Sequence, residues 1–202
     1  MPVTELLESL AGQWRDATDH PFLTGVRDGT VSREAFDAWL VQDAHFVADL
    51  LWFQARLLAR APAPARAVLA GGAVGLVEEL AWFDEQAAAR GLVMGAPRAP
   101  ATEEYATLLR RLDAADPGVA LAALWAIERV YLDAWSGAAP GAAEYSAFVA
   151  HWTTPGFATY VAELERAADA VPGVGPAGAA ADVVAGVLAA ERAFWDTAVS
   201  AR

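Results

Sequence analysis

Apolar side chains recur along most of the chain at intervals of three and four residues, which is the spacing of one face of an α-helix. The segment 124–135, LWAIERVYLDAW, is an example. No window shows sustained alternation of apolar and polar positions, the pattern typical of a half-buried strand. The pattern therefore predicts an all-α protein.

Helix-start and helix-stop residues divide this pattern into seven or eight helices. Thr4, Ser32, Thr102, Asp116 and Thr154 stand where caps are expected, a turn is expected at 20–22, and Gly91 is placed to end a helix. Residues 92–100 and 170–178 read as loops rich in Pro and Gly. The predicted helices span about 4–17, 32–60, 65–90, 102–112, 117–136, 144–152, 154–168 and 179 to the end of the sequence. We expect one bundle formed by a single domain, residues 1–202.

Three carboxylates interrupt the apolar faces of three of these helices. Glu128 lies on the face that carries Leu124 and Trp135, and Asp43 and Glu191 are surrounded by apolar positions in the same way. Each acid alone could be partly exposed or paired with an arginine such as Arg129, Arg56 or Arg192. An unpaired buried carboxylate costs several kcal/mol, so three of them together favour a shared polar pocket with perturbed pKa values.

Composition excludes several kinds of chemistry. The 202 residues include no cysteine and no lysine, all 14 basic residues being arginine, so a thiolate nucleophile and a lysine Schiff base are excluded. The net charge of −12 argues against binding to nucleic acid. Neither a targeting leader nor a membrane span is indicated, and we expect a cytoplasmic protein.

Aromatic residues lie about one turn from each acid: Phe46 after Asp43, Tyr131 after Glu128, and Phe194 and Trp195 after Glu191. Ordinary core packing explains any one of them. Together with the acids they also fit a slot for a flat, neutral or cationic heteroaromatic ring.

A metal site is less favoured by the sequence. Helical bundles often hold iron through Glu-x-x-His pairs, and none of His20, His45 and His151 follows a glutamate at that spacing. We therefore expect neither a metal nor another cofactor.

The chain resembles the TenA/thiaminase II family, whose members have the haem-oxygenase-like helical bundle. The resemblance extends over nearly the whole length and lies in the order and spacing of several short motifs: WRDATDHPFL at 14–23, RDGTVS at 27–32, WLVQDAHFV at 39–47, EELAWF at 78–83, WAIERVY at 125–131, HWTTPGF at 151–157 and ERAFW at 191–195.

This resemblance implies hydrolysis of aminopyrimidines from thiamin degradation, in their 5-aminomethyl or N-formyl forms, to hydroxymethylpyrimidine and ammonia. Asp43 matches the family aspartate that binds the aminopyrimidine edge, and Glu191 matches the glutamate that handles the proton of the leaving amine. Phe46 and Tyr105 match positions that contact the ring, and Trp152 replaces a tyrosine that is common at its position. A homo-oligomer is also implied.

The sequence departs from the best-known branch of the family at its nucleophilic cysteine. Glu128 lies near that position, similar to a branch in which a glutamate takes over. We therefore interpret Glu191 and Glu128 as catalytic, and six residues as substrate-binding: Asp43, Phe46, Glu79, Tyr105, Tyr131 and Trp152. The rival interpretations are a non-haem iron oxidase of the same fold and a non-catalytic pyrimidine-binding or regulatory protein.

Overall fold

Helices account for all the regular secondary structure in residues 3–171 and 178–200, the part of the chain described by the computed structural model. This confirms the predicted all-α class. The helices are α1 (Thr4–Ser9), α2 (Ala11–Thr18), α3 (Pro21–Asp28), α4 (Arg33–Arg60), α5 (Ala63–Arg90), α6 (Pro100–Asp113), α7 (Pro117–Ala138), α8 (Ser146–Trp152), α9 (Pro155–Asp169) and α10 (Ala179–Ser200).

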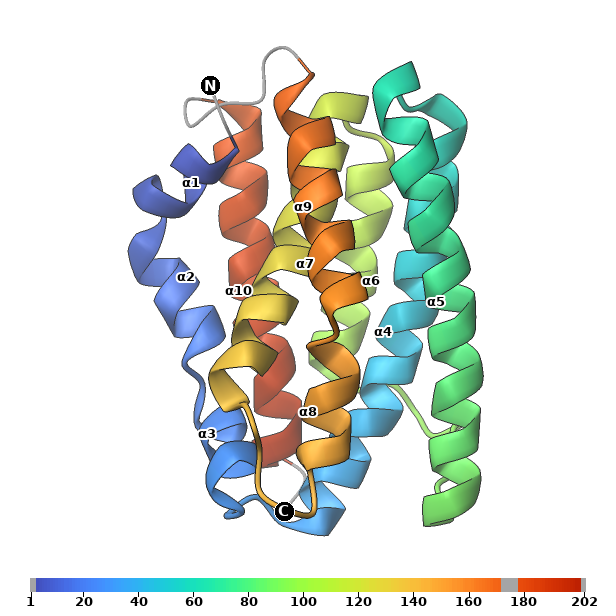
Figure 1. The fold of residues 1–202 in the computed structure, drawn as a ribbon, viewed down its shortest axis with the longest axis vertical. Helices are drawn as coiled ribbons and strands as arrows, with labels where there is room; N and C mark the ends of the chain where they lie inside the picture. The colour runs from blue at the N-terminus through green and yellow to red at the C-terminus, as the bar shows by residue number, and fades with distance from the viewer. Residues whose placement is uncertain (1–2, 172–177, 201–202) are drawn as a thin grey trace.

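The long helices run along the long axis of the molecule, and α7 lies among them (Figure 1). Helix α7 contacts α2, α3, α4, α6, α8, α9 and α10, which explains why most of its positions are apolar and buried. Helices α8 and α9 follow one another end to end, and α9 packs against α5. None of the described helices has the length and apolar character needed to cross a bilayer.

Several predicted helix boundaries are confirmed. The side chains of Ser32, Asp116 and Thr154 each accept a hydrogen bond from a backbone N–H two or three residues later, at 2.8–3.2 Å. Gly91 ends α5 with φ 71°, a left-handed conformation that glycine adopts without strain. Helix α10 begins at Ala179, while residues 172–177 of the predicted loop lie outside the described part of the chain.

The first predicted helix is wrong in detail, because residues 4–17 form two helices separated at Leu10. The turn predicted at 20–22 is also wrong. Pro21 instead occupies the first turn of α3, where its missing N–H costs no hydrogen bond, and His20 caps that helix by accepting from a backbone N–H through Nδ1 at 3.2 Å.

Thr102 does not cap a helix, because α6 starts two residues earlier with Pro100 in its first turn. The Thr102 hydroxyl instead donates to Oε1 of Gln42 at 2.8 Å. The same oxygen accepts from the backbone N–H of Ala99 at 2.8 Å. Gln42 thereby fixes the start of α6 against α4.

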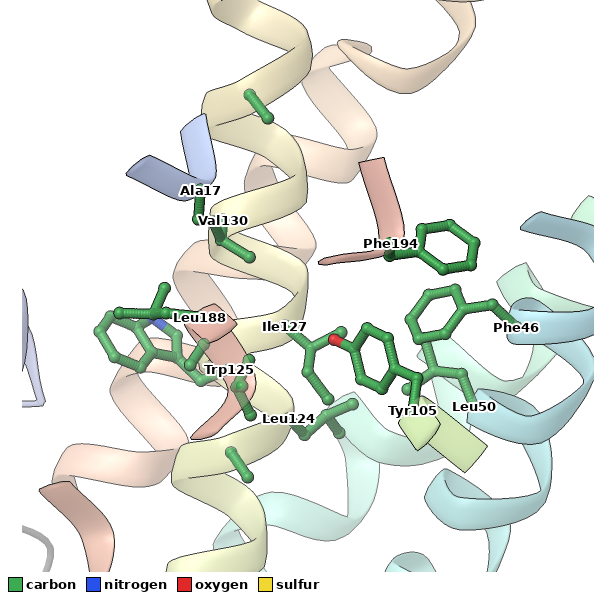
Figure 2. Packing of buried hydrophobic residues seen from close by; sticks show 14 of the residues in the cluster. Ala17, Phe46, Leu50, Tyr105, Leu124, Trp125, Ile127, Val130, Leu188 and Phe194 are labelled. Carbon is green, nitrogen blue, oxygen red and sulfur yellow. The ribbon is translucent and has the colours of Figure 1, made fainter. Parts of the chain in front are cut away.

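Aromatic rings fill much of the core between these helices. Figure 2 shows Phe46 of α4, Tyr105 of α6 and Phe194 of α10 gathered beside α7. Their ring centroids lie 4.6 Å (Phe46 to Tyr105), 5.5 Å (Phe46 to Phe194) and 6.2 Å (Tyr105 to Phe194) apart. These contacts join α4, α6 and α10, two of which carry the predicted acids.

Candidate active site

The three predicted acids are buried and come from helices that contact one another. Asp43 on α4, Glu128 on α7 and Glu191 on α10 are 0 %, 6 % and 1 % exposed, and each pair of these helices is in contact. Within the described residues none of these acids pairs with an arginine. The arginines near them in sequence have other partners: Arg129 binds Asp133 and Glu165, Arg56 binds Asp113, and Arg192 binds Asp16.

Burial keeps protons on these carboxyls. Loss of hydration raises the pKa of Glu128 to about 8, and repulsion from Glu191 and Glu79 adds to the rise. Burial also raises the pKa of Glu191 to about 8, against a hydrogen bond from Tyr105.

Asp43 shows the same effect. Burial raises the pKa of Asp43 well above its ordinary value, a hydrogen bond from Tyr131 opposes the rise, and repulsion from Glu79 and Glu191 adds to it. The Tyr131 hydroxyl donates to Oδ2 of Asp43 at 3.0 Å. The other oxygen, Oδ1, is buried, and no donor to it is found among the described residues. Oδ1 therefore has hydrogen-bonding capacity that no described protein group uses.

Tyr105 donates a hydrogen bond to Glu191, just as Tyr131 does to Asp43. Its ring is 1 % exposed, and its hydroxyl donates to Oε1 of Glu191. Each of the two most deeply buried acids is thus held by one tyrosine.

A cavity of about 550 Å³ opens beside these acids, between α4, α5, α7, α8 and α9. Five of the predicted site residues line it, namely Phe46, Glu79, Glu128, Tyr131 and Trp152. Asp43, Tyr105 and Glu191 do not line it and lie behind its wall. Direct contact between these three and a ligand therefore requires side chains of the wall to move.

The cavity wall is acidic as well as aromatic. Glu78, Glu79, Glu128 and Glu163 line it, and neither lysine nor arginine is among the lining residues. Such a wall attracts a cationic or hydrogen-bond-donating ligand and repels a phosphate ester.

Glu79 has both carboxylate oxygens occupied by protein donors. Oε1 accepts from Nε1 of Trp152 at 2.8 Å, and Oε2 lies 2.7 Å from Nε2 of His151. The ring of His151 stacks on Trp82 with centroids 3.9 Å apart and planes 5° from parallel. Glu79 thus holds two cavity-lining side chains of α8.

A second group of residues at the cavity, around Tyr160, was not predicted from the sequence. The hydroxyl of Tyr160 donates to Oε1 of buried Gln54 at 3.1 Å, and Nε2 of Gln54 donates to the backbone oxygen of Leu69 at 2.8 Å. Hydrogen bonding between Tyr160 and Glu128 works against the rise in the pKa of Glu128. Gln54 follows Asp43 by eleven residues, three helical turns, and that spacing was the available signal.

Gly72 makes room for this group. A Cβ atom at that position would lie 2.4 Å from Nε2 of Gln54 and 2.4 Å from the hydroxyl of Tyr160. Gly71 and Gly72 both lie within α5. The structure gives Gly72 a packing role.

The remaining histidines fit structural roles. Nε2 of His45 lies 2.9 Å from the backbone oxygen of Ala96, outside the cavity lining. His20 caps α3 and contacts Asp196. Within the described residues, no group of three or more His, Cys, Asp and Glu side chains is arranged to hold a metal ion.

The chain is similar over residues 7–201 to the family described as TENA/THI-4/PQQC. It is 33% identical over 132 residues to a Glycine max protein named "Probable bifunctional TENA-E protein". That match covers 61% of this chain and 57% of the soybean protein, so the chain spans a little over half the length of this relative.

Solved structures share the fold. A TenA homologue from Pyrococcus furiosus is 26% identical, with a TM-score of 0.91, and the match covers 98% of this chain and 100% of that one. A structure called a TenA family transcription regulator, from Silicibacter sp. TM1040, is 16% identical, with a TM-score of 0.87 over 98% of this chain and 96% of that one. The latter likeness shows the fold alone.

Proposed function

The chain belongs to the TENA/THI-4/PQQC family, and from that premise we propose that it hydrolyses aminopyrimidine products of thiamin degradation. The substrates are the 5-aminomethyl pyrimidine, which yields hydroxymethylpyrimidine and ammonia, and its N-formyl form, which yields formate in addition. Family membership supports a thiamin-related role, and the cavity supports the finer assignment.

The observation that carries the proposal is the unpartnered Oδ1 of Asp43, on a helix that contacts the two helices carrying the buried carboxyls of Glu128 and Glu191. An aminopyrimidine presents an amino group and a ring nitrogen side by side on one edge. A carboxyl group can serve both positions, since it accepts from the amino group through one oxygen and bonds the ring nitrogen through the other. Asp43 would fix the ring in this way once side chains of the cavity wall move aside.

Stacking against aromatic side chains of the cavity would hold the faces of the pyrimidine ring. Phe46 and Tyr131 both line the cavity, and Trp152 lies 6.0 Å from Tyr131 between ring centroids. Stacking on such rings favours a flat heterocycle over a flexible ligand.

Glu191 would give its proton to the departing amine. An amino group is a poor leaving group unless its nitrogen gains a proton as the bond breaks, and a carboxyl that keeps its proton near neutral pH can supply it. Glu191, with a pKa of about 8, meets that condition. Glu128, in the cavity wall, would hold the attacking water or remove its proton.

The decisive experiment is an assay of ammonia release from 4-amino-5-aminomethyl-2-methylpyrimidine by the purified protein. Time-dependent ammonia and equimolar hydroxymethylpyrimidine are the expected result. Saturable binding of the pyrimidine without ammonia release would favour a non-catalytic binding or regulatory protein. Activity that depends on added iron would favour the oxidase interpretation.

A further inference from the structure

The pair formed by Glu79 and His151 is the feature of the cavity that the mechanism above leaves unused. Glu79 lies on α5 and His151 on α8, 72 residues apart in sequence, and both line the cavity together with Glu128. Their contact, Oε2 to Nε2, measures 2.7 Å.

Two contacts fix the imidazole. Trp82, one helical turn after Glu79, covers one face of the His151 ring in parallel stacking at 3.9 Å. The ring edge is held by Glu79, whose second oxygen is tied to Trp152. An imidazole held by stacking and by a carboxylate has little freedom to rotate.

The hydrogen bond also sets the tautomer. A carboxylate only accepts hydrogen bonds, so the neutral tautomer that fits this contact has its proton on Nε2 of His151 and a lone pair on Nδ1. Among the described residues no hydrogen bond to Nδ1 is found. A base oriented by a carboxylate, with its other nitrogen free, is the arrangement by which many enzymes activate a nucleophile.

The proposed hydrolysis needs such a base. With pKa values of about 8, Glu128 and Glu191 are mostly protonated at pH 7 and act as hydrogen-bond donors or acids. Among the residues that line the cavity, His151 supplies the one imidazole.

We propose that His151 is the general base of the hydrolysis, that Glu79 is the residue that positions it, and that Glu128 holds the attacking water. This inference rests on the proposed function. The water oxygen bonds to the exocyclic carbon while one water proton passes to Nδ1 of His151. The bond from carbon to nitrogen breaks, nitrogen keeps the electron pair and takes a proton from Glu191, and ammonia leaves. Return of the proton from His151 to Glu191 completes the cycle.

The test compares His151→Gln with His45→Gln, a matched control whose histidine bonds a backbone oxygen outside the cavity lining. We expect His151→Gln to lower kcat by about 100-fold or more, with KM changed little, and His45→Gln to match the wild type. In His151→Gly, added imidazole should restore turnover in proportion to its concentration. Unchanged kcat in His151→Gln, or no rescue of a folded His151→Gly, would overturn the assignment.

Glu79→Gln tests positioning separately. The carboxamide presents an N–H to Nε2 of His151, which moves the ring proton to Nδ1 and removes the base. We expect a lower kcat at similar KM, and ¹⁵N NMR should show Nε2–H in the wild type and Nδ1–H in Glu79→Gln. If His151 of the wild type carries its proton on Nδ1, the NMR result alone contradicts the proposal, whatever the activity.

The two proposals can fail separately. If the wild type releases ammonia and His151→Gln does so at the same rate, the function stands and the role of His151 is wrong. If the wild type releases none, the proposed function is wrong, and the role of His151 in it is wrong as well.

Discussion

The hydroxyl of Tyr131 on α7 donates to Oδ2 of Asp43 on α4 over 3.0 Å, which leaves Oδ1 as the buried oxygen without a partner. Tyr131 thus faces the cavity with its ring and holds an acid behind the wall with its hydroxyl. This one side chain links the surface that a ligand meets to the carboxyl that we propose recognises it.

Tyr131→Phe should weaken substrate binding. The change leaves Oδ2 of Asp43 buried without a donor and raises the pKa of Asp43 further, since the lost hydrogen bond favours the ionised form. We expect KM to rise about tenfold and the free energy of unfolding to fall by about 1–3 kcal/mol. Steady-state kinetics and urea unfolding measure the two effects. Tyr145→Phe is the control, because its hydroxyl donates to the backbone oxygen of Val31 and Tyr145 is outside the cavity lining.

Glu191→Gln should abolish most turnover while the protein stays folded. The amide oxygen can still accept the hydrogen bond from Tyr105, but the group has no proton to give to the leaving amine. We expect kcat to fall by about 100- to 10,000-fold, measured as ammonia release, with an unchanged circular dichroism spectrum. Glu85→Gln, on the exposed face of α5, should leave the rate as it is. Full activity in Glu191→Gln would refute the acid role.

The buried glutamates should make the protein less stable as the pH rises. Glu128 and Glu191 have folded pKa values of about 8 against 4.5 for an exposed glutamate. Between these values the folded protein holds protons that the unfolded chain has lost, so stability is full below pH 4.5 and falls up to about pH 8. Each group can contribute up to about 1.4 kcal/mol per pH unit.

Urea unfolding at pH 5 and pH 8 measures this dependence. Glu128→Gln removes one of the two groups, so the free energy of unfolding should decline less between these pH values than in the wild type. In Glu85→Gln the free energy of unfolding should decline between these pH values as steeply as in the wild type. An equally steep decline in Glu128→Gln would mean that Glu128 is not held protonated.

Helical periodicity was enough to predict the all-α class and to place the acids on buried faces. Asp43, Glu128 and Glu191 each interrupt an apolar stripe, and three such interruptions correctly indicated burial. The cap residues Asp116 and Thr154 were found because a cap acts over two or three residues. Both signals are local.

The contacts that organise the cavity are not local, and so the sequence did not reveal them. Glu79 meets His151 across 72 residues, and Tyr160 meets Gln54 across 106. Periodicity indicates which face of a helix is buried, but not which other face it meets. For the same reason the sequence could not show that Asp43, Tyr105 and Glu191 lie behind the cavity wall.

Gly72→Ala should disturb the cavity in a way that the same change at the neighbouring residue does not. A Cβ at Gly72 would lie 2.4 Å from both buried Gln54 and partly buried Tyr160, so one of these side chains must move. We expect a loss of about 1–3 kcal/mol in the free energy of unfolding, with lower activity because Tyr160 no longer supports Glu128. A Cβ at Gly71 meets nothing within 4 Å, so Gly71→Ala should be neutral or stabilise the helix by about 0.5–1 kcal/mol. Thermal unfolding of both variants decides the matter, and equal stability would show that Gly72 has no packing role.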